Sequence, residues 1–199
     1  MLDAALAQLR EGRVVAIATE SYFGLLADAG SGAALSCLFS LKPRGADKGV
    51  PLLLPDVSSW ARLVAAIPPT AERLAERFWP GALSIALPAR ADVDARVALG
   101  RSVAVRIPGP SPALDLVRAF GRPLTATSAN LPGEPPARSD AAVKSAFGAA
   151  IADGRLLVVP GSAPGGKPST IAVLDGAGLR IAREGAVPAA VVLAAAAAP

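Results

Sequence analysis

Apolar and polar residues follow two different periods along the chain, which predicts helices and strands in turn. Helices are predicted where apolar side chains gather on one helical face, at 2–9, 33–41, 58–66, 70–77, 112–120 and 139–147. Compact aliphatic and β-branched runs, typical of buried strands, occupy 14–18, 51–54, 83–87, 102–107, 124–127, 156–159, 170–174 and 179–182. Thr70 and Ser139 are predicted to cap the helices that begin at them.

The interleaving of these elements predicts an α/β fold. The last two strands are expected to form a hairpin across 175–178, which makes the sheet mixed. Two stretches rich in proline and glycine, 131–136 and 160–168, are interpreted as loops at strand ends, where ligands of α/β folds usually bind. We therefore expect a single domain over 1–199, with a core of about 10–186 and an alanine-rich tail from 187 that is assigned no function.

The composition narrows the class of protein. Of 199 residues, 52% are hydrophobic but only 4% are aromatic, which suits a buried sheet better than a disordered chain. Charge or proline interrupts every apolar run before the roughly 18–20 residues that a membrane span needs. Asp3 and Glu11 lie in the first thirteen residues, which are therefore not interpreted as a signal peptide. A cytosolic protein without a membrane partner is expected.

The absence of histidine restricts the chemistry. Cys37 is the only cysteine, so an intrachain disulfide is impossible. With one cysteine and no histidine, the sequence argues strongly against a zinc site built by this chain alone. Nucleophile pairs with histidine and the usual neutral-pH general base are excluded as well. The remaining candidates are hydroxyls, Lys, Arg, carboxylates, backbone amides or a metal that arrives with a ligand. A net charge of +4 favours anionic partners such as phosphates or RNA.

A short loop concentrates cations after the second predicted helix. Lys42, Arg44 and Lys48 fall within seven residues, and Pro43 and Gly45 keep the segment out of a helix. Arg44 could hold a phosphate or carboxylate with two parallel hydrogen bonds, and the lysines would act as point charges. The alternative is an ordinary solvated basic loop. The P-loop pattern is absent, so any ATP is bound in another way.

An arginine lies inside an apolar strand. Arg106 follows Val103, Ala104 and Val105, where an unpaired guanidinium is costly. Either a structural carboxylate or an anionic ligand should therefore meet it. Two hydroxyl-rich segments lie at the ends of predicted strands, 18–25 and 125–130, and could hold a polar ligand. The first could equally be a plain turn, and the second, taken alone, is better explained as one.

Taken in order, these segments resemble the YrdC/TsaC family, the threonylcarbamoyl-AMP synthases. Six family motifs occur with similar spacing between Arg13 and Gly185, at 18–25, 42–48, 79–84, 103–108, 128–133, and 168–171 with 183–185. The chain departs from the family pattern at several positions. Ala18 stands for the usual proline, and Leu53 is apolar where some longer relatives carry a polar contact to threonine.

The resemblance implies an open twisted mixed sheet with flanking helices and a wide basic concavity. It also implies a nucleotidyltransferase that makes L-threonylcarbamoyladenylate from L-threonine, bicarbonate and ATP, for the modification of adenosine next to the anticodon in tRNA. Neither a general acid or base nor a tightly bound cofactor is implied, and Mg²⁺ is expected to enter with ATP. The expected partners are the downstream tRNA threonylcarbamoyltransferase machinery and tRNA or double-stranded RNA.

Carried over by position, the family's binding residues fall into two groups. The residues expected to contact threonine are Thr19, Arg106 and Ser169. Those expected around ATP are Lys42, Arg44, Lys48, Ser102, Ser128, Asn130, Arg138 and Arg183.

Two alternatives stay open. One is a non-catalytic module that binds double-stranded RNA or tRNA, although eight aromatic residues leave little surface for reading single strands. The other is a related carbamoyl-transferring enzyme that acts on another acceptor, usually as part of a much larger chain.

Overall fold

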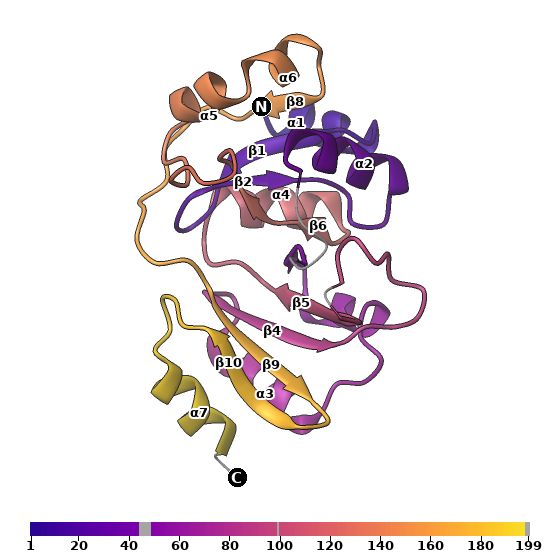
Figure 1. Cartoon of the computed structure of the whole chain (residues 1–199), viewed down its shortest axis with the longest axis vertical. Coiled ribbons are helices and arrows are strands. Elements are labelled where there is room, and N and C mark those ends of the chain that lie inside the picture. Colours follow the sequence, from indigo (N-terminus) through magenta and orange to yellow (C-terminus); the bar gives the residue numbers. More distant parts are fainter. Residues whose placement is uncertain (44–48, 99, 198–199) are drawn as a thin grey trace.

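A computed structural model describes residues 1–43, 49–98 and 100–197, and it has two mixed sheets where one was expected (Figure 1). The four-stranded sheet has the order β7 (Thr127–Ser128), β2 (Phe23–Leu26), β1 (Val14–Ala18) and β8 (Leu156–Val158). The six-stranded sheet has the order β10 (Gly178–Arg183), β9 (Thr170–Asp175), β4 (Leu83–Pro88), β5 (Ser102–Arg106), β3 (Leu52–Leu53) and β6 (Leu124–Thr125). The α/β class and the mixed pairing are confirmed. The antiparallel hairpin of β9 and β10 is also as expected.

Helices flank both sheets. They are α1 (Leu2–Arg10), α2 (Gly32–Leu41), the 3₁₀ helix η1 (Val57–Arg62), α3 (Pro69–Phe78), α4 (Pro112–Phe120), α5 (Asp140–Ala146), α6 (Gly148–Ala152) and α7 (Ala189–Ala197). Ser139 caps α5 as predicted, by accepting the amide of Ala142. Thr70 is not a cap, because α3 begins one residue earlier with Pro69 and its N-cap is Pro68. None of the helices in the described part of the chain has the length and hydropathy of a membrane span.

Side chains of β4 and β5 alternate between the hydrophobic core and the opposite face of the six-stranded sheet. Leu83, Ile85 and Leu87 of β4 point into the larger hydrophobic cluster, as do Val103 and Val105 of β5. Because successive side chains of a strand point to opposite faces, the residues between them lie on the other face of the sheet. That face carries small or polar side chains, namely Ser84, Ala86, Ser102, Ala104 and Arg106.

The two sheets share a continuous stretch of chain. Residues 124–127 were expected to form one strand, but the structure divides them: β6 pairs with β3, and β7 pairs with β2 of the other sheet. Ala126 lies between the two short strands, and its amide donates to the carbonyl of Pro51 at 2.7 Å. The chain therefore passes from one sheet to the other within a single residue.

Two elements, β2 and α6, were not predicted from the sequence, and a third, α7, forms in the tail that was assigned no function. β2 lies in the hydroxyl-rich segment interpreted as a loop, and its Gly24 weakens the strand signal. α7 lies in the alanine-rich tail and packs on α3, where Val192 is buried and Arg73 donates to the carbonyl of Ala196 at 2.9 Å. The single-domain organisation stays a prediction.

Candidate functional site

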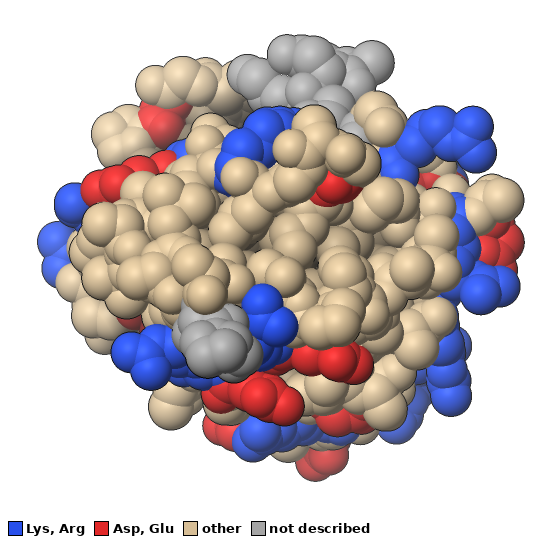
Figure 2. Space-filling model, turned by 90° about the horizontal axis from the view of Figure 1, so that it is seen from below, with Lys and Arg blue, Asp and Glu red and all other residues tan. Residues whose placement is uncertain are grey.

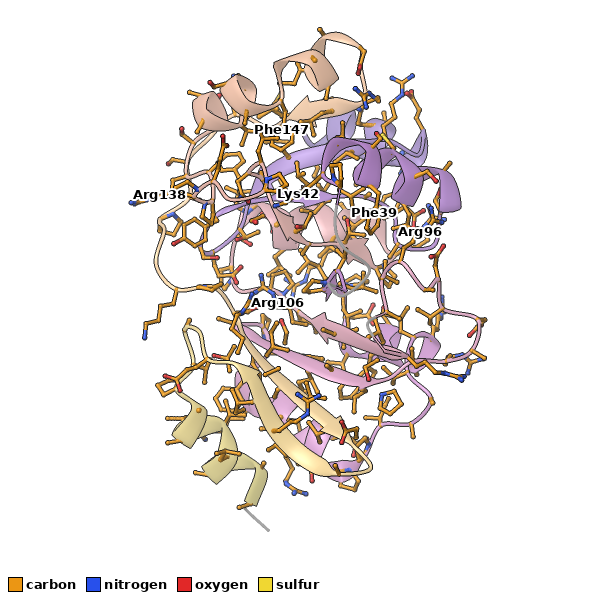
Figure 3. The ribbon with its side chains drawn as sticks, in the orientation of Figure 1. Phe39, Lys42, Arg96, Arg106, Arg138 and Phe147 are labelled. Carbon is orange, nitrogen blue, oxygen red and sulfur yellow. The ribbon has the colours of Figure 1, made fainter. Side chains whose placement is uncertain are left out.

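A cavity of about 310 Å³ opens beside the point where the chain passes between the two sheets. Residues from seven separate segments of the chain line it, which explains why no single motif describes it. Five of the residues expected from sequence are among them: Thr19, Arg106, Ser128, Ser169 and Arg183. Figure 3 shows Arg106 between the two sheets, with Lys42 above it.

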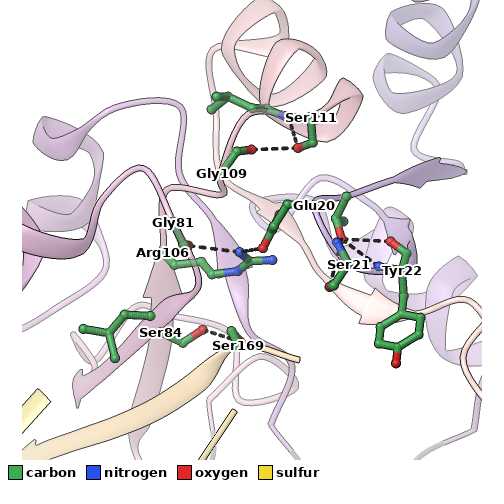
Figure 4. A network of polar contacts seen from close by, with 12 residues as sticks. Glu20, Ser21, Tyr22, Gly81, Ser84, Arg106, Gly109, Ser111 and Ser169 are labelled. Atoms are coloured by element: carbon green, nitrogen blue, oxygen red, sulfur yellow. Dashed lines mark hydrogen bonds and ion pairs between the residues drawn. The ribbon is translucent and has the colours of Figure 1, made fainter. Parts of the chain in front are cut away.

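Arg106 is the last residue of β5, and the described part of the chain holds its guanidinium at one nitrogen. Nη1 donates to the carboxylate of Glu20 and to the carbonyl of Gly81, the latter at 3.1 Å (Figure 4). The side chain is 7% exposed. Among the described residues, Nε and Nη2 have no hydrogen-bond acceptor. Of the two partners that the sequence allowed, a structural carboxylate is present in Glu20, and one edge of the guanidinium stays open to the other, an anionic ligand.

The motif at 79–84 presents the Gly81 carbonyl to Arg106. The Trp79–Pro80 peptide bond is cis, and the indole Nε1 of Trp79 donates to the carbonyl of Leu83 at 2.7 Å. A Cβ at Gly81 would lie 2.3 Å from the carbonyl oxygen of Phe78, so only glycine fits this turn. The motif thus serves Arg106 through the backbone carbonyl of Gly81.

Thr19 lines the cavity, and its hydroxyl is bonded within the turn that follows β1. Its Oγ1 donates to the carbonyl of Tyr22 at 2.8 Å and accepts the amides of Ser21 and Tyr22 at 3.2 and 3.3 Å. A threonine hydroxyl of this kind closes a turn on its own backbone. The turn places Glu20 against Arg106 and puts Ser21 on the cavity wall. Sequence reasoning assigned a role to neither of these two residues.

Arg183 and Ser169 form the floor at the C-terminal side. Arg183 Nη2 donates to the Ser169 carbonyl at 2.8 Å and to its Oγ at 3.3 Å, and that hydroxyl lies 3.1 Å from Oγ of Ser84. Burial, and secondly the positive charge of Arg106, lower the pKa of the Arg183 guanidinium from its ordinary value. Two guanidinium groups therefore share the site with the single carboxylate of Glu20, which favours an anionic ligand.

Gly185, the last residue of the motif at 183–185, allows Arg183 and Ser169 to lie this close together. A Cβ at Gly185 would lie 2.1 Å from the carbonyl oxygen of Pro168. Its amide donates to Oγ1 of the buried Thr170 at 2.9 Å. The chain after β10 is thereby pressed against 168–170, which holds Arg183 beside Ser169.

Lys42 organises the turn at 128–130. Its Nζ donates to the Ser128 carbonyl at 2.7 Å, to the Ser128 hydroxyl at 3.1 Å and to Oδ1 of Asn130 at 2.9 Å. Asn130 in turn donates to the carbonyls of Leu131 and Glu134. Of these three expected ATP contacts, only Ser128 lines the cavity.

The other expected ATP residues lie elsewhere. Ser102 shares the face of β5 that carries Arg106, but it lines a second cavity of about 400 Å³. Arg138 is exposed at the edge of the molecule (Figure 3), where its Nη2 donates to the Pro164 carbonyl at 2.6 Å. Arg44 and Lys48 lie outside the described residues.

The family model Sua5_yciO_yrdC, described as telomere recombination, matches residues 7–185. A threonylcarbamoyl-AMP synthase of Stenotrophomonas maltophilia is 42% identical over 141 residues, which are 69% of this chain and 75% of the relative. One of Bacillus subtilis is 41% identical over 133 residues, 66% of this chain. The match spans only 38% of the Bacillus subtilis protein.

Solved structures agree with these sequence matches. The Sua5 protein of P. abyssi complexed with L-threonine superposes with a TM-score of 0.88 at 32% identity, over 98% of this chain and 56% of that one. E. coli YciO superposes with a TM-score of 0.77 at 24% identity, over 93% and 89% of the two chains, which supports the fold alone.

Proposed function

Because the chain belongs to the Sua5/YciO/YrdC family, we propose that it forms L-threonylcarbamoyladenylate from L-threonine, bicarbonate and ATP, with release of pyrophosphate. The observation that carries the proposal is the half-engaged guanidinium of Arg106 at the cavity wall. Nε and Nη2 of an arginine match the two oxygens of a carboxylate in a planar, two-pronged pair. The α-carboxylate of threonine is the group that this edge would bind.

The proposed reaction needs no histidine. The amine of threonine combines with bicarbonate to give a carbamate and water. A carbamate oxygen then attacks the α-phosphate of ATP, and the bond to the pyrophosphate breaks. Phosphoryl transfer of this kind depends mainly on positioning and on neutralising charge, both of which Arg106 and Arg183 supply to anions in the cavity.

The shared face of β5 offers room for the nucleotide. Ser102 and Arg106 are four residues apart on one strand, so about 13 Å separates them along the sheet. The residues of this face around Ser102, Ala86 and Ala104, are small. We therefore place the nucleotide between Ser128 and Arg183 at one end and Ser102 at the other.

Magnesium is proposed to enter as a complex with ATP. In the described part of the chain, no group of three His, Cys, Asp or Glu residues is placed to hold a metal ion. Glu20, the carboxylate beside the cavity, is already bonded to Arg106. The phosphates of ATP would thus supply the ion's ligands from the nucleotide side.

The product is proposed to serve the tRNA threonylcarbamoyltransferase machinery, which transfers the group to tRNA in the cytoplasm. To test the activity, the protein is incubated with ATP, bicarbonate and labelled threonine, and with mixtures that lack one substrate each. We expect labelled adenylate and pyrophosphate only in the complete mixture. Pyrophosphate released from ATP alone, and unchanged by the other two substrates, would show a simple nucleotidase instead.

A further inference from the structure

We propose that Glu20 is a positioning residue, which anchors Arg106 at Nη1 so that the opposite edge of the guanidinium faces the carboxylate of the substrate. This inference rests on the proposed function, because it assigns a task to a residue of the same site. No motif role was expected for Glu20, and it acts here through Arg106 without touching the substrate.

The contacts of Arg106 divide its guanidinium into a held edge and a presented edge. Nη1 carries both hydrogen bonds, to the Glu20 carboxylate and to the Gly81 carbonyl (Figure 4). Two acceptors on one nitrogen fix the plane of the group, as one acceptor would not. Because Glu20 binds end-on, it leaves the pair Nε and Nη2 free to form a two-pronged bond.

The carboxylate of Glu20 is enclosed on the side away from Arg106. Its Cγ would lie 3.4 Å from a Cβ at Gly109, so the bare backbone there makes room for the side chain. Oε2 is buried and has no hydrogen-bond partner among the described residues. An anionic oxygen left in this state is unfavourable, and such departures are typical of functional sites. Arg106 is the partner that retains the carboxylate there.

The charge balance supplies the reason for an anchor. Arg183 also lines the cavity, and its positive charge and that of Arg106 repel each other, which adds to burial in lowering the pKa of Arg183. Without Glu20, Arg106 would be free to turn away from its neighbour and from the substrate. A carboxylate behind Arg106 offsets the repulsion without occupying the cavity.

The test compares ligands that differ in one group. L-threonine and L-threoninamide share every atom of the side chain, but only threonine carries a carboxylate. We expect Glu20→Ala to lower the affinity for threonine about ten-fold or more, as for the loss of a charge-assisted hydrogen bond. The affinities for threoninamide and ATP should stay within about two-fold of those of the parent. Glu20→Gln keeps an acceptor oxygen for Nη1 and should lose less. Equal losses for threonine and threoninamide would overturn the proposal.

A double-mutant cycle separates action through Arg106 from a general structural effect. In an Arg106→Lys background the guanidinium is absent, so adding Glu20→Ala should lower the affinity for threonine little further. Additive losses would mean that Glu20 acts independently. Asp28→Asn is the control, because the Asp28 side chain is also enclosed, at 7% exposed against 20% for Glu20, and pairs with Arg122 at 2.9 Å outside this cavity. Threonine affinity should not change in Asp28→Asn. If it falls there as well, the effect belongs to the loss of any enclosed ion pair and not to Glu20.

One measurement does not depend on the substrate. In the ligand-free protein, a fixed Arg106 should give a separate NMR signal for its Nη1 protons, assigned by its loss in Arg106→Lys. Glu20→Ala should remove the signal, and its persistence would overturn the proposal. If the parent protein shows the signal but no threonine-dependent pyrophosphate release, the proposed function fails and the anchor stands. If the parent is active and Glu20→Ala equals it in threonine affinity, only the anchor fails.

Discussion

At the scale of the residue, Arg106 tests whether geometry or charge governs the site. Arg106→Lys keeps the charge but replaces the planar fork with a single ammonium group. We expect threonine affinity to fall by about 10- to 100-fold, the range for hydrogen bonds to charged groups, while ATP affinity changes little. Titration calorimetry with each ligand measures both. A variant that binds threonine as well as the parent would remove Arg106 from the threonine site.

The same substitution addresses the RNA-binding alternative. A duplex-binding module would respond to charge more than to geometry, and its affinity would fall steeply with salt. Arg106 is 7% exposed, too enclosed to reach a duplex. On the face of the molecule that Figure 2 shows, acidic and basic side chains are mixed around an uncharged centre. RNA affinities of parent and Arg106→Lys at two salt concentrations complete the comparison.

Gly185 carries a second prediction at this scale. In Gly185→Ala the new methyl group meets the Pro168 carbonyl, so the backbone must move and Arg183 with it. We expect a loss of stability on the order of 1–3 kcal/mol, as for overpacking, together with weaker ATP binding. Urea unfolding and nucleotide titration measure the two effects. Gly176→Ala is the control, because a Cβ there meets nothing within 4 Å.

At the scale of the element, Thr125 fastens the strand that passes between the sheets. Its Oγ1 accepts the amide of the buried Ala27 at 2.9 Å. Thr125→Val preserves the shape but leaves that amide unpaired, which should cost about 1–3 kcal/mol in urea unfolding. Thr125→Ser retains the acceptor and should cost less than Thr125→Val. The reverse order would show that the methyl group matters more than the hydrogen bond.

The elements also show where sequence reasoning succeeds. The strands over 83–87 and 102–107 were predicted to within one residue of their observed ends, because aliphatic residues recur at every second position. The segment 124–127 was read as one strand, because nothing in its composition marks Ala126 as a crossing point. The segment 58–66 was expected to be a helix, and only Val57–Arg62 is helical, as a 3₁₀ turn.

The site was predictable in part for a similar reason. The position of Arg106 within an apolar strand predicted that a carboxylate or another anion would pair with it. The sequence did not identify Glu20 as that carboxylate, because the pairing joins residues 86 positions apart, one in the turn between β1 and β2 and the other at the end of β5. Thr19 was assigned to the substrate from its motif position, whereas its hydroxyl bonds depend on the turn geometry. Family position predicted the neighbourhood of these side chains better than their hydrogen-bond partners.

At the scale of the whole molecule, the cavity draws on both sheets, so its ligands should stabilise the complete fold. Threonine at 100 times its Kd is expected to add about 2.7 kcal/mol to the free energy of unfolding. ATP should add its own increment. In Arg106→Lys the threonine increment should shrink and that of ATP should persist. Thermal unfolding with each ligand tests this, and no shift from threonine in the parent would contradict a site between the sheets.

The passage of residues 124–128 from one sheet to the other limits how this protein can be cut into complementing fragments. A break at Ala126 falls between β6 and β7 and so frees the adjoining ends of an edge strand in each of the two sheets at once. A break at the exposed Asp92 falls between β4 and β5, away from the ends of both strands. Two fragments divided at Asp92 would therefore carry intact strands for reassembly, which makes that connection the position of choice for a split reporter.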